Sequence, residues 1–63
     1  MMTLAGVRTA LNMGMKVCYG TSRFEVYLDQ MGEIMTHDLK AGTTAYLDSD
    51  NAGQCFIKTG WND

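Results

Sequence analysis

The sequence contains no proline, only two cysteines and a single histidine among its 63 residues. Two cysteines allow at most one disulfide, so a disulfide-rich scaffold is excluded. No apolar run approaches the roughly 18 residues that a membrane-spanning helix needs, and no apolar segment of a leader peptide follows a basic start. We therefore expect a cytoplasmic protein with reduced thiols and no contact with a membrane.

Charged residues are also few, at 19% of the chain, and seven acidic against five basic side chains give a formal net charge of -2. The hydrophobic fraction of 46% is ordinary, and we expect residues 1–63 to form one small domain. Ordering a chain costs roughly 1.5 kcal/mol per residue in conformational entropy. In a chain of this size, the free energy gained by burying apolar surface, at about 25 cal/mol per Å², is close to that cost. Association is expected to add stability, and we predict a homodimer or larger homo-oligomer.

The first fifteen residues have the spacing of an amphipathic helix. Thr3 can cap its start, and Gly14 marks its end near residues 13–15. The apolar side chains recur three, four and one positions apart and form one stripe: Leu4, Val7, Ala10, Leu11 and Met15. This pattern predicts a helix of about three turns that covers one surface.

Residues 23–29 alternate between polar and apolar side chains and predict the clearest strand of the chain. Phe24, Val26 and Leu28 form its inner face. Asp29 and Gly32 stand first and fourth in a four-residue turn, the arrangement of a type I turn followed by a left-handed glycine. Residues 33–39 are therefore expected to return antiparallel to the first strand.

Two signals disagree about the register of this hairpin. The turn residues pair Leu28 with Ile34, whereas the hydrophobic pattern pairs Leu28 with Met35 and Val26 with His37. Because a slip of one residue turns every side chain to the other face, the two registers place His37 on opposite faces. The sequence leaves this choice open.

Residues 43–47 and 54–59 predict two further strands, joined by a polar loop over residues 48–53. The predicted fold is of the α+β class: one N-terminal helix packs on a four-stranded antiparallel sheet. Residues 16–19 are also β-prone, and in the alternative they add a fifth strand at an edge.

The residues that could bind metal are poorly spaced for it. Cys18, His37 and Cys55 stand 19 and 18 positions apart, whereas structural zinc sites bring ligands in close pairs. Residues 48–53 imitate the start of a calcium loop, but Ala52 supplies no oxygen at its fifth position and Thr59 replaces the glutamate at its twelfth. We expect no metal and no cofactor.

Catalysis is not expected either. A nucleophile such as Cys18 needs a base beside it, and His37 is the one histidine. Asp38 is adjacent to His37 in sequence, but neighbours on a strand point to opposite faces, so Asp38 cannot orient the imidazole. We predict that the chain is not an enzyme and has no catalytic residue.

The face of the sheet that the helix leaves uncovered is the candidate binding surface. It is expected to carry a set of aromatic and acidic side chains: Tyr27, Glu25, Asp29, Tyr46 and Phe56. The leading hypothesis is a protein-binding module, similar as a class to the short acidic accessory or inhibitor proteins that phages and plasmids direct against host enzymes. Its acidic side chains would occlude a basic groove on the partner: Glu25, Asp29, Glu33, Asp48 and Asp50.

Two other functions remain as alternatives. The chain could be a small subunit of a larger protein assembly, with the uncovered face as a permanent interface. A nucleic-acid-binding domain is the third hypothesis, because a set of aromatic and basic side chains resembles an aromatic platform with basic neighbours: Arg23, Tyr27, Tyr46, Phe56 and Lys58. A net charge of -2 opposes it, since such binding rests on several phosphate contacts, and no nucleic-acid partner is expected.

The spacing of the candidate ligands predicts that folding needs no metal. Circular dichroism spectra recorded with and without a strong chelator are expected to coincide. Loss of structure on adding the chelator, reversed by zinc, would contradict this prediction and identify the cysteines as ligands.

Overall fold

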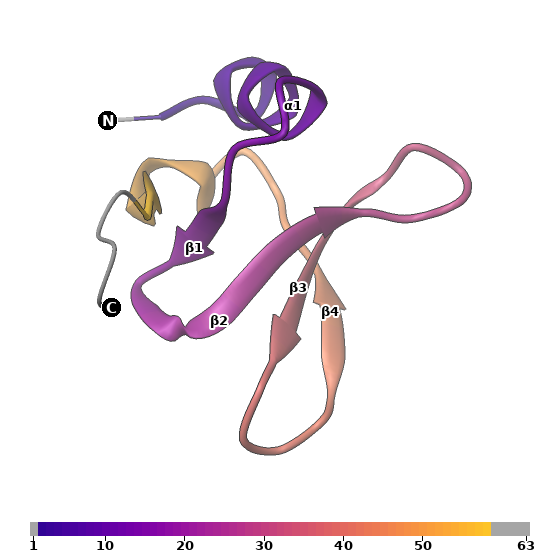
Figure 1. Cartoon of the computed structure of the whole chain (residues 1–63), viewed down its shortest axis with the longest axis vertical. Helices are drawn as coiled ribbons and strands as arrows, with labels where there is room; N and C mark the ends of the chain where they lie inside the picture. The colour runs from indigo at the N-terminus through magenta and orange to yellow at the C-terminus, as the bar shows by residue number, and fades with distance from the viewer. Residues whose placement is uncertain (1, 59–63) are drawn as a thin grey trace.

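The computed structural model describes residues 2–58, in which one helix packs against a five-stranded antiparallel sheet (Figure 1). The elements follow one another along the chain as α1 (Leu4–Asn12), β1 (Val17–Tyr19), β2 (Thr21–Leu28), β3 (Ile34–Asp38), β4 (Thr44–Tyr46), the short 3-10 helix η1 (Ala52–Gln54) and β5 (Cys55–Ile57). The strands lie in the order β4-β3-β2-β1-β5. The predicted α+β class is confirmed. Thr59, predicted as the end of the last strand, lies outside the described residues.

The additional strand that the sequence allows at residues 16–19 is β1, and it lies inside the sheet and not at its edge. It pairs antiparallel with β2 on one side and with β5 on the other. Val17 and Cys18 are each 1% exposed, although they point to opposite faces. A short apolar run of this kind suits a strand with a neighbour on each side better than an exposed edge strand.

Helix α1 begins as its sequence predicts and ends earlier. The Thr3 hydroxyl accepts a hydrogen bond of 3.1 Å from the backbone N–H of Gly6. The helix stops at Asn12, and Gly14 takes a left-handed φ of 81° that lets the chain turn toward β1. Met15 therefore falls beyond the helix and is 40% exposed, so it is not part of the apolar stripe that packs on the sheet.

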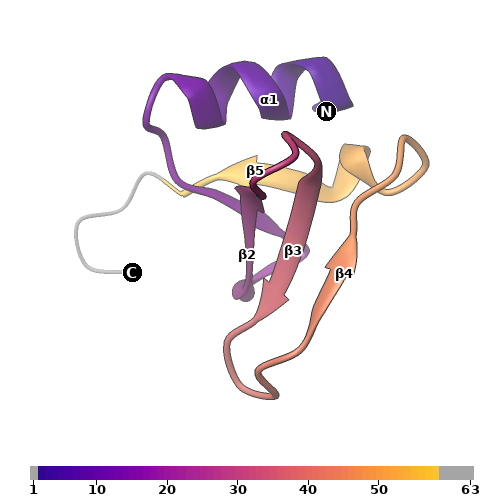
Figure 2. The ribbon, with the colours of Figure 1, turned by 90° about the vertical axis from the view of Figure 1, so that its right-hand side faces the viewer.

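The core lies between α1 and the sheet face beneath it. Figure 2 shows α1 lying across the top of the sheet, with β5 running below the helix. The buried cluster consists of Val7, Ala10, Val17, Val26, Ile34, Leu47 and Cys55. Of the three β2 residues predicted to face inward, Val26 is buried and Leu28 packs against the cluster. Phe24 is only partly buried, and its ring stands edge-on to that of Tyr19 with 6.2 Å between centroids.

The β2–β3 hairpin adopts the register that its turn residues favour. Leu28 pairs with Ile34 and Val26 with Thr36, so the alternative pairing of Leu28 with Met35 does not occur. The Asp29 side-chain oxygen Oδ1 accepts hydrogen bonds from the backbone N–H groups of Met31 and Glu33, at 2.9 and 2.8 Å. Gly32 takes a left-handed φ of 81°, as the turn requires. Turn chemistry thus outweighs the hydrophobic pattern.

The opposite end of the hairpin is held by an ion pair. Arg23 in β2 donates from Nε to Asp38 Oδ1 and from Nη2 to Asp38 Oδ2, both at 2.7 Å. Asp38 Oδ1 also accepts from the backbone N–H groups of Lys40 and Ala41, at 3.0 and 3.1 Å. One carboxylate therefore joins the start of β2, the end of β3 and the turn that leads to β4.

This carboxylate predicts how stability depends on pH. The hydrogen bonds from Arg23, with those from Ala41 and Lys40, hold the pKa of Asp38 well below its usual range near 4. A carboxyl whose pKa is lowered by folding stabilises the protein above its unfolded pKa, and this contribution is lost as the pH falls below about 4. Asp38→Asn is expected to lower the urea midpoint at pH 7 and to reduce its fall between pH 5 and pH 2.

Glu33→Gln is the matched control, since Glu33 is an exposed carboxylate between β2 and β3. It is expected to keep the midpoint and the pH dependence of the wild type. Equal pH profiles for Asp38→Asn and the wild type would show that the ion pair does not contribute in this way.

Candidate functional site

The sheet face that points away from α1, called here the outer face, is the candidate binding surface. Side chains alternate along β2, so Val26 points into the core while Glu25 and Tyr27 point to the outer face. The register of the neighbouring strands then decides which side chains lie beside them. Two rows of outer-face residues cross the sheet from strand to strand.

The first row, called here the tyrosine row, consists of Tyr27, Met35 and Tyr46. Tyr27 pairs with Met35, and Met35 pairs with Tyr46, so the three side chains lie on adjacent strands β2, β3 and β4. Directly opposite residues have Cβ atoms about 4.5–5.5 Å apart, which brings such side chains into contact. Tyr46 is 71% exposed and Tyr27 36% exposed, so the row presents aromatic surface to solvent.

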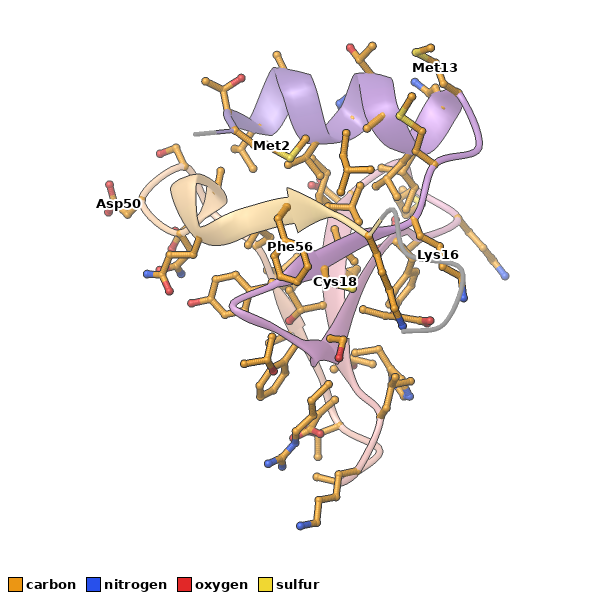
Figure 3. The ribbon with its side chains drawn as sticks, turned by 60° about the vertical axis from the view of Figure 1, so that its left-hand side comes forward. Met2, Met13, Lys16, Cys18, Asp50 and Phe56 are labelled. Atoms are coloured by element: carbon orange, nitrogen blue, oxygen red, sulfur yellow. The ribbon has the colours of Figure 1, made fainter. Side chains whose placement is uncertain are left out.

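The second row is more polar. It runs through Cys18, Glu25, His37 and Thr44, with Phe56 opposite Cys18 at the other side of β1. Figure 3 shows Phe56 on β5 and Cys18 on β1, with Lys16 just before β1. Lys16 Nζ lies 3.9 Å from Glu25 Oε2, a long and solvent-exposed ion pair that contributes little to stability.

The structure places four of the five predicted binding residues on the outer face. Tyr27, Tyr46 and Glu25 lie in the two rows, and Phe56 shares the face in β5. Asp29 lies in the β2–β3 turn, where its Oδ1 accepts two backbone hydrogen bonds and holds the turn.

Met35 is an outer-face residue that the sequence left open, because only the register favoured by the turn residues places it on that face. The turn signal at Asp29 and Gly32 could have found it, because this signal alone predicts the register that sets Met35 opposite Tyr27.

The second row contains a thiol, a carboxylate and an imidazole, but the thiol and the imidazole are not neighbours. Glu25 stands between Cys18 and His37, so the backbones of these two residues lie two strand spacings apart, about 9.6 Å. A base must lie within about 3.2 Å of the nucleophile it activates. Asp38, on the other face, is engaged by Arg23. This arrangement does not form a nucleophile–base pair.

Side chains that could bind a metal ion do not gather elsewhere in the described chain either. Within residues 2–58, no three histidine, cysteine or acidic side chains gather closely enough to hold a metal ion. A hollow of about 550 Å³ lies between the start of α1 and the loop before β5. It is lined by apolar side chains such as Met2 and Leu4, and Asp50 is the charged residue at its wall.

The two cysteines are buried thiols on neighbouring strands. Cys18 pairs with Phe56 and Cys55 with Tyr19, so the two cysteines lie one position out of register and point to opposite faces of the sheet. Burial raises the pKa of the Cys55 thiol, and the nearby Cys18 raises it further. A raised pKa lowers the fraction of reactive thiolate, the opposite of what a catalytic cysteine needs.

No helix within the described residues is long and apolar enough to cross a membrane. Comparisons of the chain with protein-family models, with curated proteins and with solved structures find no match.

Burial of both thiols predicts slow modification by an aromatic disulfide reagent. In the native protein the reaction is expected to proceed at least about 100-fold more slowly than in denaturant, where both thiols react at once. Rapid reaction of one native thiol, at a rate above that of a free peptide thiol, would contradict this prediction and indicate an activated nucleophile.

Proposed function

We propose that this protein is a non-enzymatic binding module that docks on another protein through its outer face. The observation that carries the proposal is the tyrosine row: two exposed tyrosines flank a methionine on three adjacent strands. Tyrosine and methionine are enriched in protein interfaces, where tyrosine contributes a large rigid surface and a hydroxyl for hydrogen bonding. A surface meant only for water does not require such a row.

The surroundings of the tyrosine row have the composition of an interface rim. Glu25, Lys16, His37 and Thr44 border the row with side chains of both charges and of neutral polarity. Rims of this kind exclude water from a central apolar patch and fix its orientation on the partner. A partner surface with an apolar centre and mixed charge around it fits this face.

Not all of the acidic side chains are available to occlude a basic groove on the partner, because some of them hold turns of this chain. Glu25 lies beside the tyrosine row, whereas Asp29 holds the β2–β3 turn and Asp48 Oδ1 accepts from the backbone N–H of Asn51. Occlusion of the partner therefore rests on the tyrosine row with Glu25. A cytoplasmic accessory or inhibitor protein of phage or plasmid type is the role that we propose for such a module.

The small core favours a second candidate, a subunit of a larger protein assembly. Among the described residues, the largest fully buried side chains are those of Val7, Val17 and Cys18. A core of such small side chains gains stability from a permanent neighbour. The outer face would then be covered in every functional state, and the isolated chain would unfold at lower temperature than the assembly.

Site-specific photocrosslinking tests the proposed binding surface. A photoreactive phenylalanine analogue replaces Tyr27 or Tyr46 in turn, and each variant is irradiated in a lysate of the cells that make the protein. Both positions are expected to give the same crosslinked partner, identified by mass spectrometry. Tyr27→Ala is expected to leave the protein folded and to weaken binding to that partner by about 1–2 kcal/mol.

Met13 and Met31 are the matched control positions, since they are 66% and 85% exposed and lie outside the outer face. The analogue at these positions is expected to give no such product. Equal crosslinking from all four positions, or binding unchanged by Tyr27→Ala, would exclude the outer face as the docking surface.

A further inference from the structure

Strand β4 forms one edge of the sheet, and the direction of its backbone groups follows from its pairing with β3. Asp38 N–H donates to the Thr43 carbonyl, and Leu47 N–H donates to the Ile34 carbonyl. In an antiparallel pair the bonded residues alternate, so Ala45 between these bonds points its N–H and carbonyl toward β3. The N–H and carbonyl groups of Thr44 and Tyr46 therefore point outward, away from the sheet.

Nothing in β4 obstructs the approach of another strand. Its three residues, Thr44, Ala45 and Tyr46, are all exposed and carry no charge. Charged side chains, prolines and bulges are the usual means by which a protein prevents pairing at a sheet edge. The length of β4, three residues, is the only such protection that it has.

The other edge, β5, is protected. The same alternation points the backbone groups of Cys55 and Ile57 outward, because Gly20 N–H donates to the Gln54 carbonyl and Lys58 N–H to the Lys16 carbonyl. The outward N–H of Cys55 already donates to the Ala52 carbonyl of η1. Cys55 is also 6% exposed, and α1 lies above this strand (Figure 2). The two edges therefore differ in their ability to accept a new strand.

We propose that a second copy of this chain pairs with the first along β4, antiparallel and about a two-fold axis at Ala45. This register sets Thr44 opposite Tyr46 of the second copy, and each such pair exchanges both of its outward hydrogen bonds. This register can form hydrogen bonds because the residues that it pairs, Thr44 and Tyr46, are those whose backbone groups point outward. The pairing is independent of the proposed docking on another protein.

Charge complementarity supports the same axis. Lys40 and Asp50 each stand five positions from Ala45, on opposite sides of it. Antiparallel pairing about Ala45 therefore brings the Lys40 end of one copy toward the Asp50 end of the other, twice in each dimer. Both side chains are exposed, so the attraction is available without breaking a contact inside the chain. A parallel pairing would instead set like charges side by side.

The pairing also accounts for the large exposure of Tyr46, which is 71% in the single chain. Across the two-fold axis, the Tyr46 side chains of the two copies become diagonal neighbours on the outer face, about 7–8 Å apart and within reach of each other. The outer faces of the two copies then form one continuous surface with a tyrosine row on each side of the axis.

Sedimentation equilibrium over a range of micromolar concentrations tests the pairing. The weight-average mass is expected to rise from the 7.0 kDa of the monomer toward twice that value. Thr44→Pro removes an outward N–H and leaves the bonds between β3 and β4 in place, so it is expected to stay at the monomer mass. Thr44→Val keeps the N–H and is expected to associate like the wild type. Circular dichroism checks that each variant is folded.

Charge reversal provides a second test that does not alter the backbone. Lys40→Glu and Asp50→Lys are each expected to raise the dissociation constant about fivefold, and the double variant is expected to restore it. A mass of 7.0 kDa at every concentration would overturn the pairing. Association that survives Thr44→Pro but is lost in Tyr27→Ala would overturn it too and would place the second copy on the outer face.

Discussion

The register of the β2–β3 hairpin is the constraint on which the rest of the structure depends, and it is fixed at both ends. At the turn, Asp29 accepts two backbone hydrogen bonds and Gly32 supplies the left-handed conformation. At the open end, Arg23 and Asp38 form a bidentate ion pair that also ties down the following turn. A slip of one residue would break both sets of contacts together, which is why a small sheet with little core keeps one register.

This register separates the core from the candidate binding surface. It sets Val26 and Ile34 against α1, and it sets Tyr27 and Met35 side by side on the outer face. The pairing of β3 with β4 sets Tyr46 next to Met35, and the β2–β3 register then places this pair beside Tyr27. The proposed docking surface therefore depends on polar contacts at the two ends of one hairpin, and one of these contacts, at Asp38, also holds the turn that leads to β4.

Much of the fold follows from local signals in the sequence. The remaining features depend on contacts between residues that are far apart in the sequence. The Thr3 cap, the alternation along β2 and the turn at Asp29 each depend on a few neighbouring residues, and the structure has all three. The inner position of β1 could not be predicted, because it depends on pairing with β5, far away in sequence. The same holds for the alignment of Tyr27 and Tyr46 in one row, since the two residues lie on strands separated by β3.

Nuclear magnetic resonance of the labelled protein measures this register directly. Val26 and Thr36 form a pair without mutual hydrogen bonds, in which the two Cα atoms approach to about 4.5 Å and the Hα atoms lie close together. A strong Overhauser effect between the Hα protons of Val26 and Thr36 is expected. An effect between Val26 and His37 in its place would mean that the hairpin is shifted by one residue, that Met35 faces the core, and that the tyrosine row does not exist.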